Sequence, residues 1–281
     1  MLLPYLASIM AGIFYGATES INKDITEEKY SPFSYGFLQY FLNFIIFLIP
    51  AVFFVKLPPF GISYFYLVAV IIITLLANSL TIKAYKTEDI SNISILSSVT
   101  LVTTVLLGVT FLAERLNAYK ISGIILIILG IFVIFFEGKK LAVSRGLLIA
   151  LIAKILWGFQ PLFDKKALNS FDFLAYLVII MGILSFSHLL LPWVREEAVL
   201  IFSKYKRKIL LSRSFVTLGL VAYLWSIKRG SISIVNTNVD TFFLLVTVLI
   251  GIIILKERKH LLKKLVGCLV CILGIILLNL F

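Results

Sequence analysis

Acidic side chains inside apolar stretches are the first sign of chemistry in this sequence. Asp240 lies within one hydrophobic run, and Glu19 lies within another near the start of the chain. A carboxylate costs about 2.5–3.5 kcal/mol at the centre of a membrane helix, so such groups are mostly functional or paired. We therefore expect Asp240 and Glu19 to bind an amine of a substrate or to couple transport to protons. For Glu19, an ion pair with Lys23 four residues later is an equally good structural interpretation.

Hydroxyl, amide and aromatic side chains recur near these carboxylates at helical spacing. Ser94 and Ser98 share one face of the helix predicted at 90–112, and Asn236 and Asp240 share one face at 232–254. We expect these faces to meet at one central polar cavity. The predicted cavity residues are Tyr15, Glu19, Ser94, Ser98, Trp157, Gln160, Asn236, Asn238 and Asp240.

Several of these residues have a structural interpretation as well. Serines in membrane helices often bond their own backbone or help helices pack. Tyr15 and Trp157 are also typical of the aromatic belts at membrane interfaces. Lys154 either extends its ammonium toward the interface or supplies a cation to the cavity.

The elements that position these residues are apolar helices. The chain has 281 residues, of which 61% are hydrophobic and 14% charged, and its mean hydropathy is +1.08. Soluble domains have about 25% charged residues. Runs of about 20 apolar residues, enough to cross a bilayer, predict ten membrane-spanning helices. They lie at 2–21, 33–54, 64–82, 90–112, 119–136, 146–164, 172–191, 210–227, 232–254 and 264–280.

The sequence repeats itself at half its length. "IFYGATESINKD" (13–24) aligns with "ILWGFQPLFDKK" (155–166) at a separation of 142 positions, which pairs Gly16 with Gly158 and Lys23 with Lys165. The same separation pairs Ser98 with Asp240. Each copy thus has five predicted helices. Because five is odd, the second copy must enter the membrane from the opposite side.

The sequence thus predicts an all-α integral membrane protein of ten transmembrane helices in two inverted five-helix repeats. The predicted boundaries are 1–137 for the first repeat, 138–144 for a linker and 145–281 for the second repeat. Residues 193–209 are interpreted as a long basic connector. Glycines seven positions apart, 123 with 130 and 267 with 274, predict close packing of the fifth helix against the tenth.

The orientation of the chain is open. Lysine and arginine are more frequent in the connectors after the odd-numbered helices, which favours both termini outside by the positive-inside rule.

Other classes of function fit the sequence poorly. The net charge of +12 lies in turns between helices, with no soluble surface for nucleic acid. An embedded enzyme would need a catalytic motif, but the chain has two histidines and neither an HExxH nor a GxSxG motif. The two cysteines lie in the last apolar run and are interpreted as packing residues. We expect no metal and no cofactor.

Short motifs resemble a known family. They are "FYG" and "LWG" near the start of each copy, and "FLAERL" and "ILKERK" at the end of the fourth and ninth helices. With the five-helix duplication, they resemble the EamA-type branch of the drug/metabolite transporter superfamily. The resemblance implies a helical bundle around a central cavity, with the fifth and tenth helices at the periphery. It also implies transport of small metabolites such as amino acids, and both termini inside.

The predicted function is therefore secondary transport of a small metabolite, an amino acid or a related compound, by alternating access. Alternatives from the same superfamily are a multidrug or organic-cation carrier and a sugar-phosphate or nucleotide-sugar carrier; a passive channel is disfavoured by the repeat. The predicted partners are a small-molecule substrate, protons and the lipid bilayer, with no nucleic acid. We expect a multi-pass protein of the plasma membrane that is a monomer or a weak homodimer.

Overall fold

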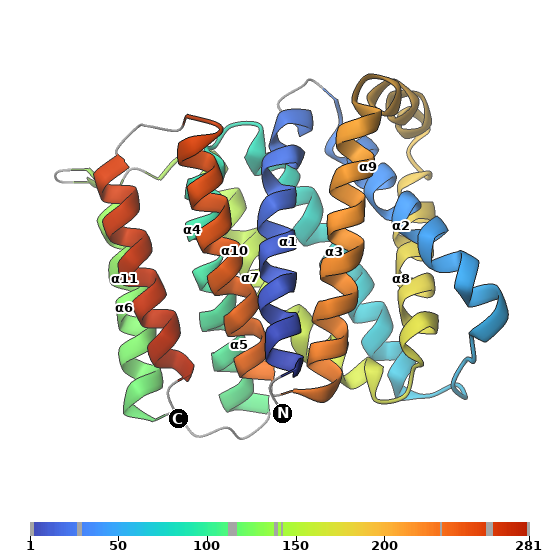
Figure 1. Ribbon diagram of the computed structural model, residues 1–281, viewed down its shortest axis with the longest axis horizontal. Helices are drawn as coiled ribbons and strands as arrows, with labels where there is room; N and C mark the ends of the chain where they lie inside the picture. The colour runs from blue at the N-terminus through green and yellow to red at the C-terminus, as the bar shows by residue number, and fades with distance from the viewer. Residues whose placement is uncertain are drawn as a thin grey trace.

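The structure, a computed structural model, describes residues 3–26, 30–111, 117–137, 140–141, 143–230, 232–256 and 261–279. Its elements are nearly all helices, which stand side by side (Figure 1). In chain order they are α1 (Leu3–Thr26), α2 (Pro32–Phe54), α3 (Ile62–Tyr85), α4 (Ile90–Ile95), α5 (Ser98–Phe111), α6 (Ala118–Phe135), α7 (Arg145–Leu168), α8 (Phe173–His188), α9 (Pro192–Arg229), α10 (Ile232–Ile253) and α11 (Leu261–Asn279). Two short strands, β1 (Phe136–Glu137) and β2 (Lys140–Leu141), pair antiparallel between α6 and α7.

The outer surface of the bundle is apolar, as lipid contact requires. Large hydrophobic side chains such as Val52, Phe53 and Ile72 point outward and are more than half exposed. Within the described residues, six helical stretches are long and apolar enough to cross a membrane, and α6 and α8 are shorter apolar helices. Exposure of so extensive an apolar surface to water would be energetically unfavourable. The chain is therefore a multi-pass membrane protein.

The fourth predicted helix is interrupted. Residues 90–112 were expected to form one helix, but the structure has α4 and α5 with a turn at Leu96–Ser97 between them. The amides of Ser97, Val99 and Thr100 donate to carbonyls three residues earlier, a tighter pattern than an α-helix. The hydroxyl of Ser94 also donates to the carbonyl of Ile90, and such bonds favour bending of a helix. The interruption is a finding that hydropathy could not predict.

The segment predicted as a connector, 193–209, is itself helical. It forms the first half of α9, which starts at Pro192 and has one non-helical residue, Tyr205, where the helix bends. Val194, Ala198 and Ile201 are buried at spacings of three and four. The segment therefore has a buried apolar face of its own, which stabilises it as a helix despite its charged residues.

Helices α6 and α11 pack closely at one edge of the bundle (Figure 1), as the glycine spacing predicted. A Cβ atom built on Gly130 would lie 2.6 Å from Cys271 Sγ and 2.8 Å from the carbonyl oxygen of Gly267. A Cβ on Gly274 would lie 2.7 Å from the carbonyl oxygen of Gly123. Only glycine allows two backbones to approach this far. Cys271 itself packs against Ile127, in accord with a packing role.

Glycine also sets the contacts between the two halves of the sequence. A Cβ on Gly16 of α1 would lie 2.8 Å from Val246 Cβ of α10. A Cβ on Gly158 of α7 would lie 2.5 Å from Thr103 Cβ of α5. The first helix of each copy thus packs against the fourth predicted helix of the other copy.

Candidate functional site

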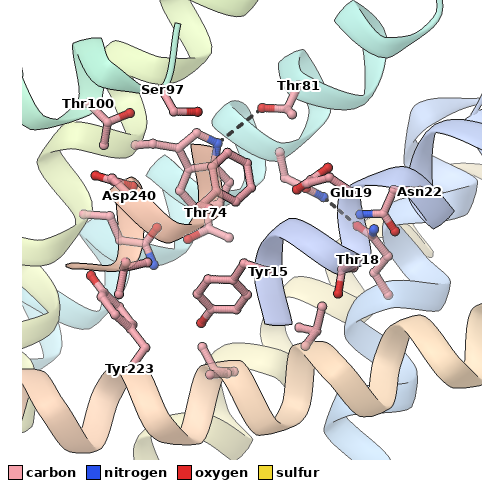
Figure 2. A pocket seen from close by; sticks show the side chains of 18 of the residues that line it. Tyr15, Thr18, Glu19, Asn22, Thr74, Thr81, Ser97, Thr100, Tyr223 and Asp240 are labelled. Atoms are coloured by element: carbon pink, nitrogen blue, oxygen red, sulfur yellow. Dashed lines mark hydrogen bonds between the residues drawn. The ribbon is translucent and has the colours of Figure 1, made fainter. Parts of the chain in front are cut away.

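The helices surround an interior cavity of about 290 Å³ (Figure 2). Its walls come from both halves of the sequence, namely α1, α2, α3, the turn between α4 and α5, α5, and α7 to α10. The lining residues are Tyr15, Thr18, Glu19, Asn22, Gln39, Tyr40, Asn43, Thr74, Asn78, Thr81, Ser97, Thr100, Lys154, Trp157, Gln160, Pro161, Met181, Arg213, Val216, Leu220, Tyr223, Asn236, Val239, Asp240 and Phe243.

The polar face of α1 forms one wall of the cavity. Tyr15, Thr18, Glu19 and Asn22 are spaced by three or four residues, so they project from the same side of the helix. Figure 2 shows these four side chains along α1, which faces the cavity. The wall exists because these four residues recur at one helical phase of a largely apolar helix.

Two aromatic residues hold equivalent places in the two copies. The ring of Tyr15 packs edge-on against Tyr223, with ring centroids 6.4 Å apart. The Trp157 indole Nε1 donates a hydrogen bond to Thr81 Oγ1 at 3.2 Å. Tyr15 is separated from Trp157 by 142 positions, and so is Thr81 from Tyr223. The first helix of each copy therefore meets the third helix of the other copy through the same pair of positions.

Threonines of α5 fix α7 at the cavity. Thr100 Oγ1 donates to the carbonyl oxygen of Lys154 at 3.0 Å, and Thr104 Oγ1 donates to that of Gly158 at 3.0 Å. Both bonds cross the close contact that Gly158 permits. They hold Lys154 and Trp157 at a defined depth in the wall.

Lys154 and Asp240 are opposite charges that face the same cavity. Lys154 is 6% exposed, and its Nζ lies 5.3 Å from the ring centroid of Phe243. It is within electrostatic reach of both Asp240 and Glu19. Among the described residues, no side chain lies within hydrogen-bond distance of the Asp240 carboxylate or of the Lys154 ammonium. The two groups therefore attract one another without a direct bond.

Glu19 and Arg213 form a second set of charges, and these have fixed partners. The hydroxyl of Tyr85 donates to the Glu19 carboxylate. Arg213, which is 4% exposed, donates through Nη2 to Asn22 Oδ1 at 3.2 Å and to Ser212 Oγ at 2.7 Å. Glu19 lies within electrostatic reach of Arg213. A buried charge held by several hydrogen bonds is an organised part of the structure.

Six of the predicted cavity residues line this cavity. They are Tyr15, Glu19, Trp157, Gln160, Asn236 and Asp240. They come from α1, α7 and α10, and the structure brings them together from both halves of the sequence. Asn236 also accepts a hydrogen bond from the hydroxyl of Tyr223 at 3.1 Å.

The other three lie elsewhere. Ser94 bonds its own helix, and Ser98 is buried next to Cys271 of α11. Asn238 donates to Ser8 Oγ of α1 at 3.0 Å. Ser98 was placed by assuming a continuous helix, but the turn after α4 presents Ser97 to the cavity instead. Asn238 is two residues from Asn236 and so points to the opposite side of α10.

Several lining residues were not predicted. Arg213 is one of them, although an arginine inside an apolar helix is a strong signal. Gln39 and Asn43 of α2, and Asn78 and Thr81 of α3, are polar residues at spacings of three and four, which periodicity could have found. Glu114 and Glu257, which are part of the motifs that resemble a known family, lie outside the described residues.

An apolar helical bundle around a cavity that holds buried charges of both signs has the architecture of a membrane transporter. The two halves of the sequence each match the EamA-like transporter family, over residues 2–136 and 144–280. The chain belongs to this family. Its members are transporters of the drug/metabolite superfamily, so a small-molecule substrate and a lipid bilayer are its partners.

The fold recurs among solved structures. One crystal structure of a protein aligns with 99% of this chain and 96% of its own, with a TM-score of 0.65 and 12% sequence identity. At this identity the likeness shows the fold alone. No curated protein matches the chain.

Proposed function

We propose that this protein carries a small zwitterionic metabolite, such as an amino acid, across the plasma membrane by alternating access. The observation that carries the proposal is the pair of Lys154 and Asp240 in one cavity. Within the described residues, neither charged group forms a hydrogen bond through its side chain. A substrate with an ammonium and a carboxylate group would give each of them a hydrogen-bonded partner of opposite charge. Asp240 would accept from the ammonium, and Lys154 would donate to the carboxylate.

The charge balance of the cavity supports a zwitterion over an ion. Its lining has two carboxylates, Glu19 and Asp240, and two cations, Lys154 and Arg213. Adding an organic cation or a phosphate would leave an uncompensated charge in a low-dielectric interior, which is costly. A zwitterion adds no net charge, so both of its ends gain attraction without this penalty.

The size of the cavity supports a small substrate. Its volume of about 290 Å³ is at the lower end of the ~300–1,000 Å³ of small-molecule sites. A nucleotide sugar is disfavoured by this size. The rings of Tyr15, Trp157 and Phe243 offer an apolar surface for the substrate side chain.

The proposal includes ten transmembrane helices in two inverted repeats, 1–137 and 145–281, joined by 138–144. Helix contacts support it because they are unchanged when the two copies are exchanged. Helix α1 packs on α9 and α10, and α7 packs on α3 and α5, while α2 packs on α8 and α6 on α11.

The direction of the helices supports the inversion. Lys23, near the end of α1, donates to the carbonyl oxygen of Glu88, just after α3, at 2.6 Å. Ser144, at the start of α7, donates to the side chain of the same Glu88. Helix α7 therefore begins where α1 ends, and the two run in opposite directions (Figure 1).

Alternating access follows from this arrangement. The cavity lies between elements of both repeats, so rocking one set of helices against the other would expose it to each side in turn. Pro161 removes one backbone donor from α7 at the cavity wall, which makes a bend there less costly. We propose a monomer as the transporting unit, because a single chain contains the whole cavity.

The test is counterflow in proteoliposomes. A panel of amino acids, organic cations and sugar phosphates is first compared by thermal shift on the purified protein, and the best stabiliser is used as a radiolabelled probe. We expect an amino acid to stabilise most and to show trans-stimulation, which a channel does not. Counterflow by an organic cation or a sugar phosphate alone would contradict the proposal.

Two variants test the charges. Asp240→Asn and Lys154→Met should each abolish binding and counterflow of the amino acid while the protein still inserts. Matched controls are Asp172→Asn at the start of α8 and Lys166→Met, whose ammonium lies over Tyr66 and outside the cavity lining. Wild-type counterflow in Asp240→Asn would remove this residue from substrate binding.

A further inference from the structure

A third carboxylate, Asp164, is buried just beyond the cavity. It is 1% exposed and lies on α7 one helical turn after Gln160, which lines the cavity and lies next to the Asp164 carboxylate. The hydroxyl of Tyr176 donates to its Oδ1. Its Oδ2 is buried and has no hydrogen-bond partner within the described part of the chain. One oxygen of this carboxylate is therefore satisfied and the other is not.

Within the part of the chain that the structure describes, no cation compensates Asp164. The adjacent ammonium, that of Lys165, donates to the carbonyl oxygen of Gly230 at 3.3 Å. The groups that face Asp164 from other helices are hydroxyls: Tyr176 of α8, Tyr223 of α9 and Tyr15 of α1. Asp240 of α10 acts on Tyr223 but adds only negative charge to this region. The four charges of the cavity balance one another, whereas Asp164 is left over.

In the other copy, the residue equivalent to Asp164 has a cation as a hydrogen-bond partner. Asn22 stands 142 positions before Asp164, and its Oδ1 accepts from Tyr35 at 2.6 Å, as Asp164 accepts from Tyr176. Asn22 is an amide, yet it also accepts from Arg213 and Ser212. The residues 142 positions before Ser212 and Arg213 are Val70 and Ile71, which belong to the apolar cluster that contains Tyr176. The carboxylate thus occurs in the copy that lacks the cation.

We infer that Asp164 is a proton-binding residue of the transport cycle. An ionised carboxylate without a cation in this interior would be very costly, and a proton on Oδ2 removes that cost. In one half of the cycle, water on one side of the membrane supplies the proton, which forms an O–H bond at Oδ2. In the other half that bond breaks and the proton leaves to water on the other side. One proton crosses per cycle, and no electron moves.

The inference rests on the proposed transport function but assigns the proton to a residue that the substrate does not touch. Asp240 binds the substrate ammonium. Asp164 lies beyond the cavity and is adjacent to Gln160, which lines the cavity. Protonation neutralises the wall on that side. This couples the ionisation of Asp164 to the helix movements that open the cavity.

The first experiment needs no substrate. Infrared difference spectra of the purified protein are recorded as pH is varied, and the carbonyl stretch of a protonated carboxylic acid is followed. We expect a titrating band in the wild type that is absent from Asp164→Asn and retained in the control Asp172→Asn. Asp164→Glu should keep a band but move its frequency. An absent band, or one that is unchanged in both variants of Asp164, would overturn the inference.

The second experiment measures coupling in proteoliposomes with an entrapped pH-sensitive dye and a radiolabelled amino acid. Asp164→Asn should lose all accumulation driven by a pH gradient while counterflow persists. Its amide can still accept from Tyr176, as Asn22 accepts from Tyr35 in the other copy. Tyr176→Phe, which breaks the tether but keeps the carboxyl, should retain accumulation.

The outcomes separate the two proposals. If the wild type shows no counterflow with any amino acid, the proposed function fails, and the infrared titration still decides whether Asp164 binds a proton. If counterflow is present and Asp164→Asn accumulates the amino acid as the wild type does, the inference alone fails. If Tyr176→Phe abolishes accumulation as fully as Asp164→Asn, the helix tether rather than the proton is responsible.

Discussion

The two ends of the cavity have similar contacts between helices, but their polar groups have different partners. At the Asn22 end, which comprises Asn22, Tyr35, Ser212 and Arg213, one amide oxygen accepts from a hydroxyl pair and a guanidinium. At the Asp164 end, which comprises Asp164 and Tyr176, a carboxylate accepts from one hydroxyl, and its Oδ2 has no hydrogen-bond partner within the described residues. Val70 and Ile71, which stand 142 positions before Ser212 and Arg213, belong to the apolar cluster of Tyr176. At both ends a tyrosine hydroxyl of the second helix of the copy donates to the polar side chain of the first helix. That side chain is a neutral amide at one end and a carboxyl group at the other.

The difference shows which parts of the duplicated framework are structural. The tyrosine bond between the first and second helix of each copy is retained, and so is the lysine that donates to the end of the third helix, Lys23 to Glu88 and Lys165 to Gly230. These interactions position α1 and α7. Among the described residues, only the Asn22 end has a cation bonded to the repeated polar residue, so the other end is free to change its charge with a proton. The two copies therefore share the contacts that position their helices, but one contains a fixed charge and the other a carboxyl group that can bind a proton.

The largest expected effect compares Asn22→Leu with Asp164→Leu. Loss of Asn22 leaves Arg213 buried without one of its acceptors, which should lower the free energy of unfolding by about 3 kcal/mol. Loss of Asp164 removes one hydroxyl acceptor but also a buried acid, so the cost should be about 1 kcal/mol. Thermal unfolding of the purified variants in detergent measures both. Equal losses would show that Asp164 is as fully satisfied as Asn22.

The next effect depends on pH. Tyr35→Phe removes a bond to a neutral amide and should cost about 1 kcal/mol at any pH. Tyr176→Phe should cost the same in acid, where Asp164 is protonated. In alkali it should cost about 2 kcal/mol, because bonds to ionised acceptors are stronger. Thermal unfolding against pH checks the divergence, and two parallel curves would contradict a titrating Asp164.

A smaller effect is expected from the lysines that cap the third helices. Lys23→Met should cost about 1 kcal/mol, since Lys23 is 8% exposed and its bond is 2.6 Å long. Lys165→Met should cost about 0.5 kcal/mol, because its bond is longer at 3.3 Å and the side chain is more exposed. The same thermal measurement ranks them. The reverse order would mean that the cap at the Asp164 end is the stronger one.

The smallest effect is expected from Asn22→Asp, which gives both ends a carboxylate. The new acid is next to Arg213, so the change in the free energy of unfolding should stay below about 1 kcal/mol. No new titrating infrared band should appear, because the guanidinium keeps the acid ionised. A second protonated-acid band would show that the cation is not what distinguishes the two ends.

Much of the fold was predictable because hydropathy and helical period act locally. Within the described residues, each predicted apolar segment except 90–112, which the turn at Leu96–Ser97 interrupts, corresponds to one helix or part of one, and the glycines of α6 and α11 indicated their contact. The interruption at Leu96–Ser97 was not predictable, since it depends on backbone bonds that no composition signals. The first half of α9 was missed because its charges outweigh its buried face in a hydropathy average.

Part of the candidate site was predicted from positions that recur in both copies. Tyr15 and Trp157 stand at repeated positions, and both line the cavity. Arg213 has no polar counterpart in the other copy, so the repeat gave no hint of it. Asp164 is the last residue of the helix predicted at 146–164, a position that gives no functional signal by itself. Its interest depends on what surrounds it in three dimensions, and a sequence alone does not contain that information.

The tight seam between α6 and α11 has a consequence for how this scaffold can diversify. Among the described residues, neither helix lines the cavity, yet Gly130, Gly267 and Gly274 each exclude even a methyl group. Adaptation to a new substrate can therefore proceed in the inner helices without disturbing this edge. The seam itself tolerates little change, and so provides a rigid edge beside which the inner helices can vary.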